Sequence, residues 1–122
     1  MTLTKVLVAE DDAASRRLVV KCIERLGYIA VQASNGRRAL SMLMDNPDIR
    51  LLITDIMMPE MDGRELVGIL RGNEQFVRLP VIMISAVAEL PDLEGILKLG
   101  AVRFVQKPID TSGLRDLLKT LL

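Results

Sequence analysis

The sequence predicts an α/β fold: a doubly wound sheet of parallel strands with helices on both faces. Apolar runs of strand length alternate along the whole chain with stretches of helical period. The apolar runs are almost continuous, which is typical of strands buried on both faces of a parallel sheet. Because crossovers between parallel strands are right-handed, this alternation winds helices onto both faces of the sheet.

In the first half of the chain, a strand over residues 5–9 leads into Asp12, a good helix N-cap. The helix that follows ends at Gly27, and a short strand is expected over 28–33. Asn35 is placed to cap a second helix, which Pro47 ends. The apolar stripes expected to face the core are Leu18, Val19, Cys22, Ile23 and Leu26 in the first helix, and Ala39, Leu40, Leu43 and Met44 in the second.

In the second half, strands are expected over 51–54, 81–84 and 102–106. A short fourth helix over 92–99 contains Gly95, which costs roughly 0.5–1 kcal/mol relative to alanine, so this helix should be weak. Thr111 or Ser112 is placed to cap the last helix. The inward residues are expected to be Leu66, Ile69 and Leu70 in the third helix, and Leu114, Leu117, Leu118 and Leu121 in the last.

Length and composition set further limits. The 122 residues suit a single domain spanning 1–122. Sixteen basic and sixteen acidic residues cancel, so no global field favours nucleic acid or an anionic membrane. No apolar run approaches the roughly 18 residues of a membrane span, and Cys22 is the only cysteine, so a cytoplasmic protein is expected. The absence of histidine excludes a Ser-His-Asp triad and histidine metal ligands within this chain.

Four of the predicted strands end in residues suited to metal or phosphate chemistry. Glu10, Asp11 and Asp12 follow the first strand, Asp55 the third, Ser85 the fourth and Lys107 the fifth. The carboxyl ends of parallel strands meet at one edge of an α/β sheet, where ligands bind. Carboxylates, a hydroxyl and a lysine at this edge indicate a site for a divalent cation and a phosphoryl group.

Each of these signals is also compatible with a purely structural role. The acidic triplet can be a solvated turn, and Asp12 is assigned to the helix cap in either case. Asp55 can be a loop aspartate, a metal ligand or a nucleophile that forms an aspartyl phosphate. Ser85 can be satisfied by the backbone, and Lys107 can simply be exposed. The combination of all four favours a functional role.

Together these segments resemble the receiver domain of two-component response regulators over essentially the whole chain. The acidic pair after Val6-Leu7-Val8-Ala9, the segment from Leu52 to Gly63 around Asp55, Pro80 to Ala86, and Phe104 to Pro108 occur in the family's order and spacing. The resemblance implies a flavodoxin-like fold with five strands in the order 2-1-3-4-5.

The resemblance also implies a function. Asp55 would accept a phosphoryl group from a phosphohistidine on a partner histidine kinase or histidine phosphotransfer protein. Mg²⁺, with Mn²⁺ able to substitute, would be held by Glu10, Asp11, Asp55 and the backbone carbonyl of Met57, with Glu10 acting mainly through water.

Ser85 and Lys107 would contact the phosphoryl group. Ser85 and Phe104 would form a switch that changes the face made by the fourth helix, the last strand and the last helix. The chain would thus be a signalling domain rather than an enzyme, although it can assist its own phosphorylation.

Some positions depart from the family's commonest pattern. Ser85 stands where threonine is frequent and Glu10 where aspartate is common, and both keep the required chemistry. Phe104 lacks the hydroxyl of tyrosine. Met57 and Val87 are apolar and cannot orient an attacking water, which predicts a fairly long-lived phosphoryl-aspartate. The downstream partner, whether another protein or an output domain outside this chain, is not defined by the sequence.

Three alternatives stay open on the sequence alone. A haloacid-dehalogenase-like phosphohydrolase also uses a nucleophilic aspartate, but it needs a second aspartate two residues on, where this chain has Met57. A flavodoxin-like FMN-binding module needs a phosphate loop after the first strand, where the acidic triplet would repel phosphate. A degenerate receiver used only for protein contacts would not need the full set of site residues.

Overall fold

The computed structural model describes residues 3–86, 98, 100 and 102–122, and within them it forms one five-stranded parallel sheet. The strands are β1 (Lys5–Ala9), β2 (Ile29–Ala33), β3 (Ile49–Asp55), β4 (Val81–Ser85) and β5 (Val102–Gln106), and their order is β2-β1-β3-β4-β5. Every neighbouring pair is parallel. The predicted fold class and strand order are therefore confirmed.

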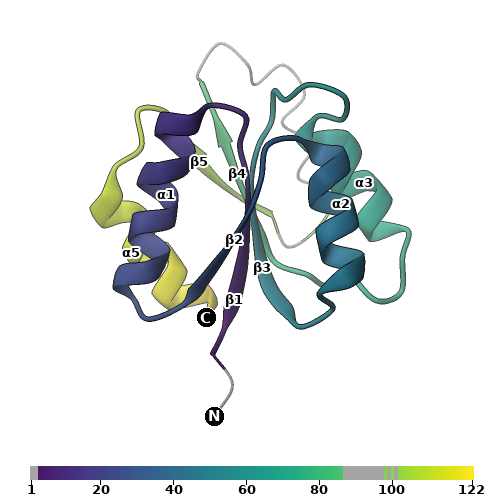
Figure 1. The fold of residues 1–122 in the computed structure, drawn as a ribbon, viewed down its shortest axis with the longest axis horizontal. Helices are drawn as coiled ribbons and strands as arrows, with labels where there is room; N and C mark the ends of the chain where they lie inside the picture. Colours follow the sequence, from purple (N-terminus) through teal and green to yellow (C-terminus); the bar gives the residue numbers. More distant parts are fainter. Residues whose placement is uncertain (1–2, 87–97, 99, 101) are drawn as a thin grey trace.

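Helices cover both faces of this sheet (Figure 1). α1 (Ala13–Arg25) and α5 (Thr111–Leu121) lie on one face, and α2 (Gly36–Asp45) and α3 (Gly63–Arg71) lie on the other. A separate hydrophobic cluster lies under each pair of helices. The predicted fourth helix over 92–99 falls outside the described residues, apart from Lys98.

The core is built on the three central strands. Val6, Leu7, Val8 and Ala9 of β1 are fully buried, as are Leu51, Leu52 and Ile53 of β3. The edge strands β2 and β5 are only partly buried, because within the described residues each pairs with a strand on one side alone. The continuous apolar runs thus correspond to the central strands, which are buried on both faces of the sheet, as predicted.

Helix boundaries follow from local capping chemistry. Asp12 and Asn35 cap α1 and α2 as predicted, each accepting a backbone N–H three residues on. The predicted cap of the last helix at Thr111 or Ser112 is wrong. Asp110 caps α5 instead, and its side chain accepts the Ser112 N–H at 3.1 Å.

The predicted apolar stripes are only partly confirmed. Leu18, Met44 and Ile69 are 39%, 46% and 44% exposed, whereas Val20 and Val67 are buried in positions that the stripes did not include. Each of the three exposed residues lies at the margin of its stripe, where a small rotation of the helix turns it to solvent. Within the described residues, no helix is long and apolar enough to cross a bilayer.

Candidate functional site

The candidate site lies where β1, β3, β4 and β5 end. Asp55 is the last residue of β3 and Ser85 the last of β4, while Glu10 and Lys107 directly follow β1 and β5. Backbone hydrogen bonds hold these ends together: the Lys107 N–H donates to the Ser85 carbonyl at 2.8 Å, and the Glu10 N–H donates to the Ala33 carbonyl at 3.0 Å. The parallel sheet therefore brings together residues that are up to 97 positions apart, from 10 to 107.

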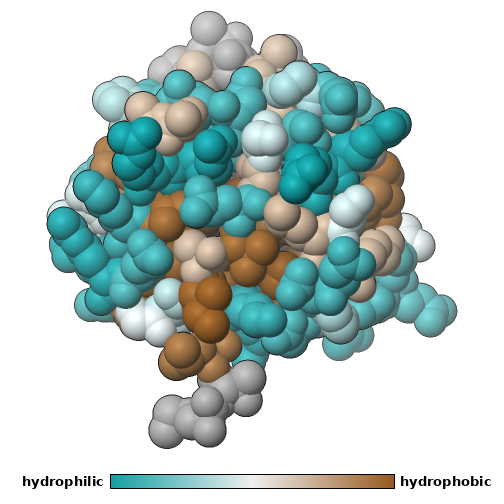
Figure 2. All heavy atoms as spheres, viewed as in Figure 1, coloured by the Kyte–Doolittle hydropathy of each residue, from teal (hydrophilic) through white to brown (hydrophobic). Residues whose placement is uncertain are grey.

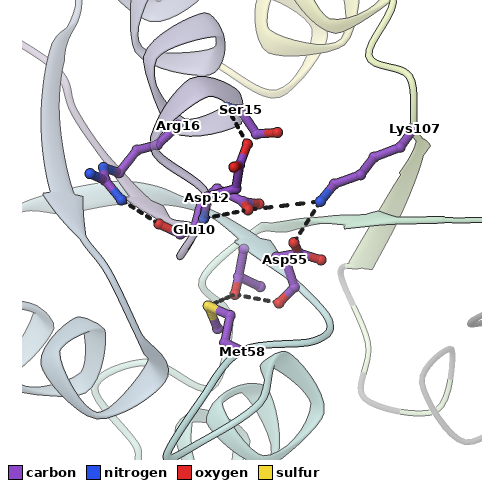
Figure 3. A network of polar contacts seen from close by, with 8 residues as sticks. Glu10, Asp12, Ser15, Arg16, Asp55, Met58 and Lys107 are labelled. Atoms are coloured by element: carbon purple, nitrogen blue, oxygen red, sulfur yellow. Dashed lines mark hydrogen bonds and ion pairs between the residues drawn. The ribbon is translucent and has the colours of Figure 1, made fainter.

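Lys107 reaches across the strand ends to the acidic residues (Figure 3). Its Nζ lies 2.8 Å from Asp55 Oδ2 and 3.8 Å from Glu10 Oε1. Asp55 and Glu10 are almost completely buried, at 4% and 1% exposed, whereas the Lys107 side chain is 30% exposed. A buried carboxylate is strongly destabilised without a positive partner. The lysine supplies part of the compensation for two carboxylates.

Glu10, Asp11 and Asp55 form an acidic cluster that can hold a metal ion. One carboxylate oxygen from each lies within 4.8 Å of those of the other two, and Asp11 is the exposed member. Among the described residues, Glu10 Oε2 and Asp55 Oδ1 are buried without a hydrogen-bond donor. A proton or a hard cation satisfies such oxygens, and an all-oxygen set with an exposed member suits Mg²⁺, which keeps part of its water shell. The residues present therefore fit the ion.

The electrostatics of the cluster indicate the same need for positive charge. Burial raises the pKa of Glu10 to about 8, and the neighbouring Asp55 adds to this because a protonated Glu10 can share its proton with that carboxylate and because the charge of Asp55 repels a second negative charge. The N–H of Asp12, which donates to Glu10 Oε1 at 3.1 Å, and the charge of Lys107 act in the opposite direction. The direction of this shift means that, without a cation, the folded site favours the protonated carboxyl of Glu10.

Other residues place the backbone of the site. Arg16, from α1, donates through Nη1 to the Glu10 carbonyl at 2.7 Å (Figure 3). The buried hydroxyl of Thr54 lies 2.9 Å from the Asp55 carbonyl and 3.9 Å from Met58 Sδ. Neither residue is among the site residues predicted from the sequence. Both bind main-chain carbonyls, so no pattern of side-chain types signals them in the sequence.

The remaining predicted residues lie around this centre. Ser85 is 2% exposed, and its neighbour Ile84 pairs in register with Asp55. Met57 follows Asp55 in the β3–α3 loop and is 54% exposed. Phe104 is partly buried in β5 and packs against the hydrophobic cluster under α2 and α3. Val87 lies outside the described residues.

Comparison with known proteins gives the family of this fold and site. The family model of the response regulator receiver domain matches residues 6–119. Chemotaxis protein CheY1 of Helicobacter pylori (strain ATCC 700392 / 26695) is 35% identical over 97% of this chain and 96% of its own length. The structure of chemotaxis protein CheY4 of Vibrio cholerae has a TM-score of 0.87 at 28% identity, covering 99% of this chain and 100% of that one. A response regulator receiver protein from Pseudomonas putida has a TM-score of 0.89 at 28% identity, with 98% of each chain covered. This chain therefore belongs to the response regulator receiver domain family.

Proposed function

We propose that this domain is a phosphorylation-activated switch in which Asp55 accepts a phosphoryl group from a phosphohistidine of a histidine kinase or histidine phosphotransfer protein. The observation that carries this proposal is the 2.8 Å contact between Lys107 Nζ and Asp55 Oδ2 beside two further carboxylates at the strand ends. An Asp55 oxygen attacks phosphorus, the phosphorus–nitrogen bond breaks, and the imidazole leaves with the bonding electron pair. The product is a mixed anhydride on Asp55.

The surrounding residues have separate roles in this proposal. Glu10, Asp11, Asp55 and the Met57 carbonyl would hold Mg²⁺, or Mn²⁺ in its place, which when bound neutralises charge on the transferring phosphoryl group. Lys107 is placed to pair with a phosphoryl oxygen once Asp55 is modified. Ser85 would donate its hydroxyl to another oxygen. The new group carries roughly −1.5 to −2 charges, so any arrangement in which Ser85 and Lys107 bind it better becomes more populated.

The readout would pass through Ser85 and Phe104. Phe104 packs at the edge of a hydrophobic cluster from the edge strand β5, where one side of the strand has no neighbour among the described residues. Movement of Ser85 toward phosphate would free space for that ring to turn inward and would alter the surface made by β5 and α5. A downstream protein or an attached output domain would recognise that surface.

The alternatives carry less weight. Family membership favours a receiver over a phosphohydrolase or an FMN-binding module. The residue two positions after Asp55 is the exposed Met57, which has no acid or base to offer a hydrolase. A receiver used only for protein contacts would not require Glu10, Asp55 and Lys107 to be assembled within ion-pair distance.

Phosphorylation of Asp55 is tested with acetyl phosphate and Mg²⁺. The expected result is a mass increase of one phosphoryl group, trapped by borohydride at Asp55 and absent from Asp55→Asn. Asp45→Asn is a suitable control. Asp45 is the last residue of α2, at the end of that helix away from the candidate site, so the variant should be modified like wild type. An adduct that persists in Asp55→Asn would contradict the assignment, as would a wild-type protein that remains unmodified.

The phosphoryl group is expected to be long-lived because Met57 cannot orient a water molecule for attack. Met57→Asn or Met57→Gln introduces an amide at this exposed position and should shorten the phosphoryl half-life by roughly tenfold, which corresponds to about 1.4 kcal/mol off the barrier to hydrolysis. Met57→Leu, which keeps the apolar character, should leave the half-life within about twofold. Decay of labelled protein in Mg²⁺ buffer measures this. Wild-type loss within seconds would contradict the prediction.

A further inference from the structure

A hollow lined by two arginines lies beside the candidate site, on the β2 side of the sheet edge. It is formed by Arg16 of α1, Gln32 and Ala33 of β2, Ser34, and Arg38 of α2. In the view of Figure 2, hydrophilic surface gathers toward the upper ends of α1 and α2, whereas hydrophobic surface follows the lower part of β2. The hollow has a volume of about 370 Å³ and is wide open to solvent. A small polyatomic ion fits in it.

The residues that line this hollow carry positive charge. Its lining contains two guanidinium groups and no carboxylate. The ion pairs among the described residues join Lys5 to Asp48 and Lys107 to Glu10 and Asp55, and none includes Arg16 or Arg38. The acceptors that Arg16 contacts are both uncharged: the Glu10 carbonyl at 2.7 Å and Gln32 Oε1 at 3.3 Å. The lining itself is therefore positively charged, and a negative group coupled to it is the Asp12 carboxylate, whose pKa is lowered by its helix-cap hydrogen bond and, to a smaller extent, by the charge of Arg16.

The lining is also rich in hydrogen-bond donors. Because Gln32 Oε1 accepts from Arg16 Nε, its amide nitrogen is left with two N–H donors for other acceptors. Ser34 adds a hydroxyl, and Arg38 adds the planar donor fork of its guanidinium. These donors come from four separate segments of the chain: α1, β2, the β2–α2 connection and α2. A tetrahedral oxyanion offers acceptor oxygens in several directions, whereas a planar carboxylate offers two oxygens in one plane.

We propose that the Arg16–Arg38 hollow is a binding site for a phosphate-type oxyanion, distinct from the site at Asp55. Arginine pairs with phosphate through charge-assisted, often bidentate hydrogen bonds. The anion is either free, as inorganic phosphate or a small phosphorylated compound, or a phosphorylated side chain of a partner protein. Arg16 also donates a hydrogen bond to the backbone carbonyl of Glu10, a member of the acidic cluster. Arg16 therefore connects the hollow directly to the acidic cluster.

The test is an NMR titration of ¹⁵N-labelled protein with inorganic phosphate near pH 7.5, in EDTA, with sodium chloride holding ionic strength constant. The expected result is a saturable shift of the Ser34 amide and of the Arg16 and Arg38 side-chain Nε–H signals. Arg38→Gln should weaken the affinity by roughly tenfold, as expected for loss of a charge-assisted contact. Arg37→Gln is the matched control: it removes the same charge from the adjacent exposed residue, which does not line the hollow. Its affinity should stay within about twofold of wild type.

The variants and the choice of anion make the result decisive. Equal weakening by Arg37→Gln and Arg38→Gln would overturn the proposal, because it would show non-specific attraction to the basic surface. Acetate binding as tightly as phosphate would overturn the assignment of ligand class. Phosphoserine binding more tightly than phosphate would support a partner's side chain as the source, and weaker binding would support a free anion. Asp55→Asn should bind phosphate like wild type, so this result is independent of whether Asp55 is the phosphoacceptor.

Discussion

Replacing Gly63 with alanine is expected to destabilise the fold and to slow phosphorylation of Asp55 at the same time. Gly63 begins α3, and its N–H donates to the Ile56 carbonyl at 2.8 Å. A Cβ at this position would clash with the Asp55 carbonyl oxygen and would lie 3.1 Å from Ile56 Cα. All of these atoms belong to the main chain, so no side-chain rotation can relieve the contact. The β3–α3 loop has to move, and this loop contains Met57 and directly follows Asp55.

The expected cost is roughly 1–3 kcal/mol of unfolding free energy, as for overpacking of a close contact. Acetyl phosphate labelling should slow by about tenfold or more, because small displacements of reacting groups are costly. Gly68→Ala is the matched control. It lies in the same helix, where an added Cβ would meet no described atom outside the helix backbone within 4 Å. Alanine there should stabilise the fold by roughly 0.5–1 kcal/mol through helix propensity.

Urea unfolding of the two variants, together with intact-mass kinetics of phosphorylation, measures both effects. A Gly63→Ala protein as stable as wild type would contradict the packing argument. A destabilised Gly63→Ala protein that is phosphorylated at the wild-type rate would show that the helix start can move without Asp55. Gly68→Ala separates these outcomes from any general effect of alanine in α3.

Much of this fold was predictable because the amino-acid sequences of the central strands reflect how deeply those strands are buried. A strand buried on both faces must be apolar throughout, so the sequence of β3 and β4 marks both the strand and its place in the sheet. The helices carry less information. Leu18, Met44 and Ile69 are apolar but exposed, because one stripe of helical period fits two slightly different rotations against the sheet. Tertiary packing selects the rotation.

The candidate site also contains residues that were predictable from the sequence and residues that were not. Glu10, Asp55 and Lys107 were predictable because their residue types are chemically distinctive and because parallel strands end at one edge. Arg16, Thr54 and Gly63 were not, because they act on main-chain atoms of the site. Any donor or small residue at the right place could do so, and only the folded chain shows which one does.

The raised pKa of Glu10 predicts an unusual pH dependence of stability in protein free of divalent ions. The pKa of Glu10 rises from 4.5 to about 8 on folding, chiefly through burial. The folded state then binds more protons than the unfolded state between these two values. The resulting stabilisation is fully present below pH 4.5 and is lost as pH rises toward 8. Asp12 and Asp48, with lowered pKa values, act only at more acidic pH, and Cys22, with a raised pKa, only above 9.

In EDTA, the unfolding free energy of the wild type should therefore fall by up to a few kcal/mol between pH 5 and pH 8. Glu10→Gln, which cannot titrate, should flatten this decline, whereas Glu24→Gln, at an exposed position in α1, should retain it. Urea unfolding at several pH values measures all three proteins. A wild-type decline that persists unchanged in Glu10→Gln would show that another group is responsible.

Mg²⁺ should reverse this decline, because a cation and a proton compete for the same carboxylates. Below about pH 5 the proton already satisfies the buried oxygens, so added Mg²⁺ has little to contribute. Near pH 8 the proton is leaving Glu10, and an ion bound to the folded state alone stabilises it by an amount that grows with its concentration. The stabilisation by Mg²⁺ should thus increase with pH in the wild type and in Glu24→Gln, and much less in Glu10→Gln. Equal stabilisation by Mg²⁺ at pH 5 and pH 8 would contradict the assignment of this acidic cluster as the metal site, because proton and cation would then not share their ligands.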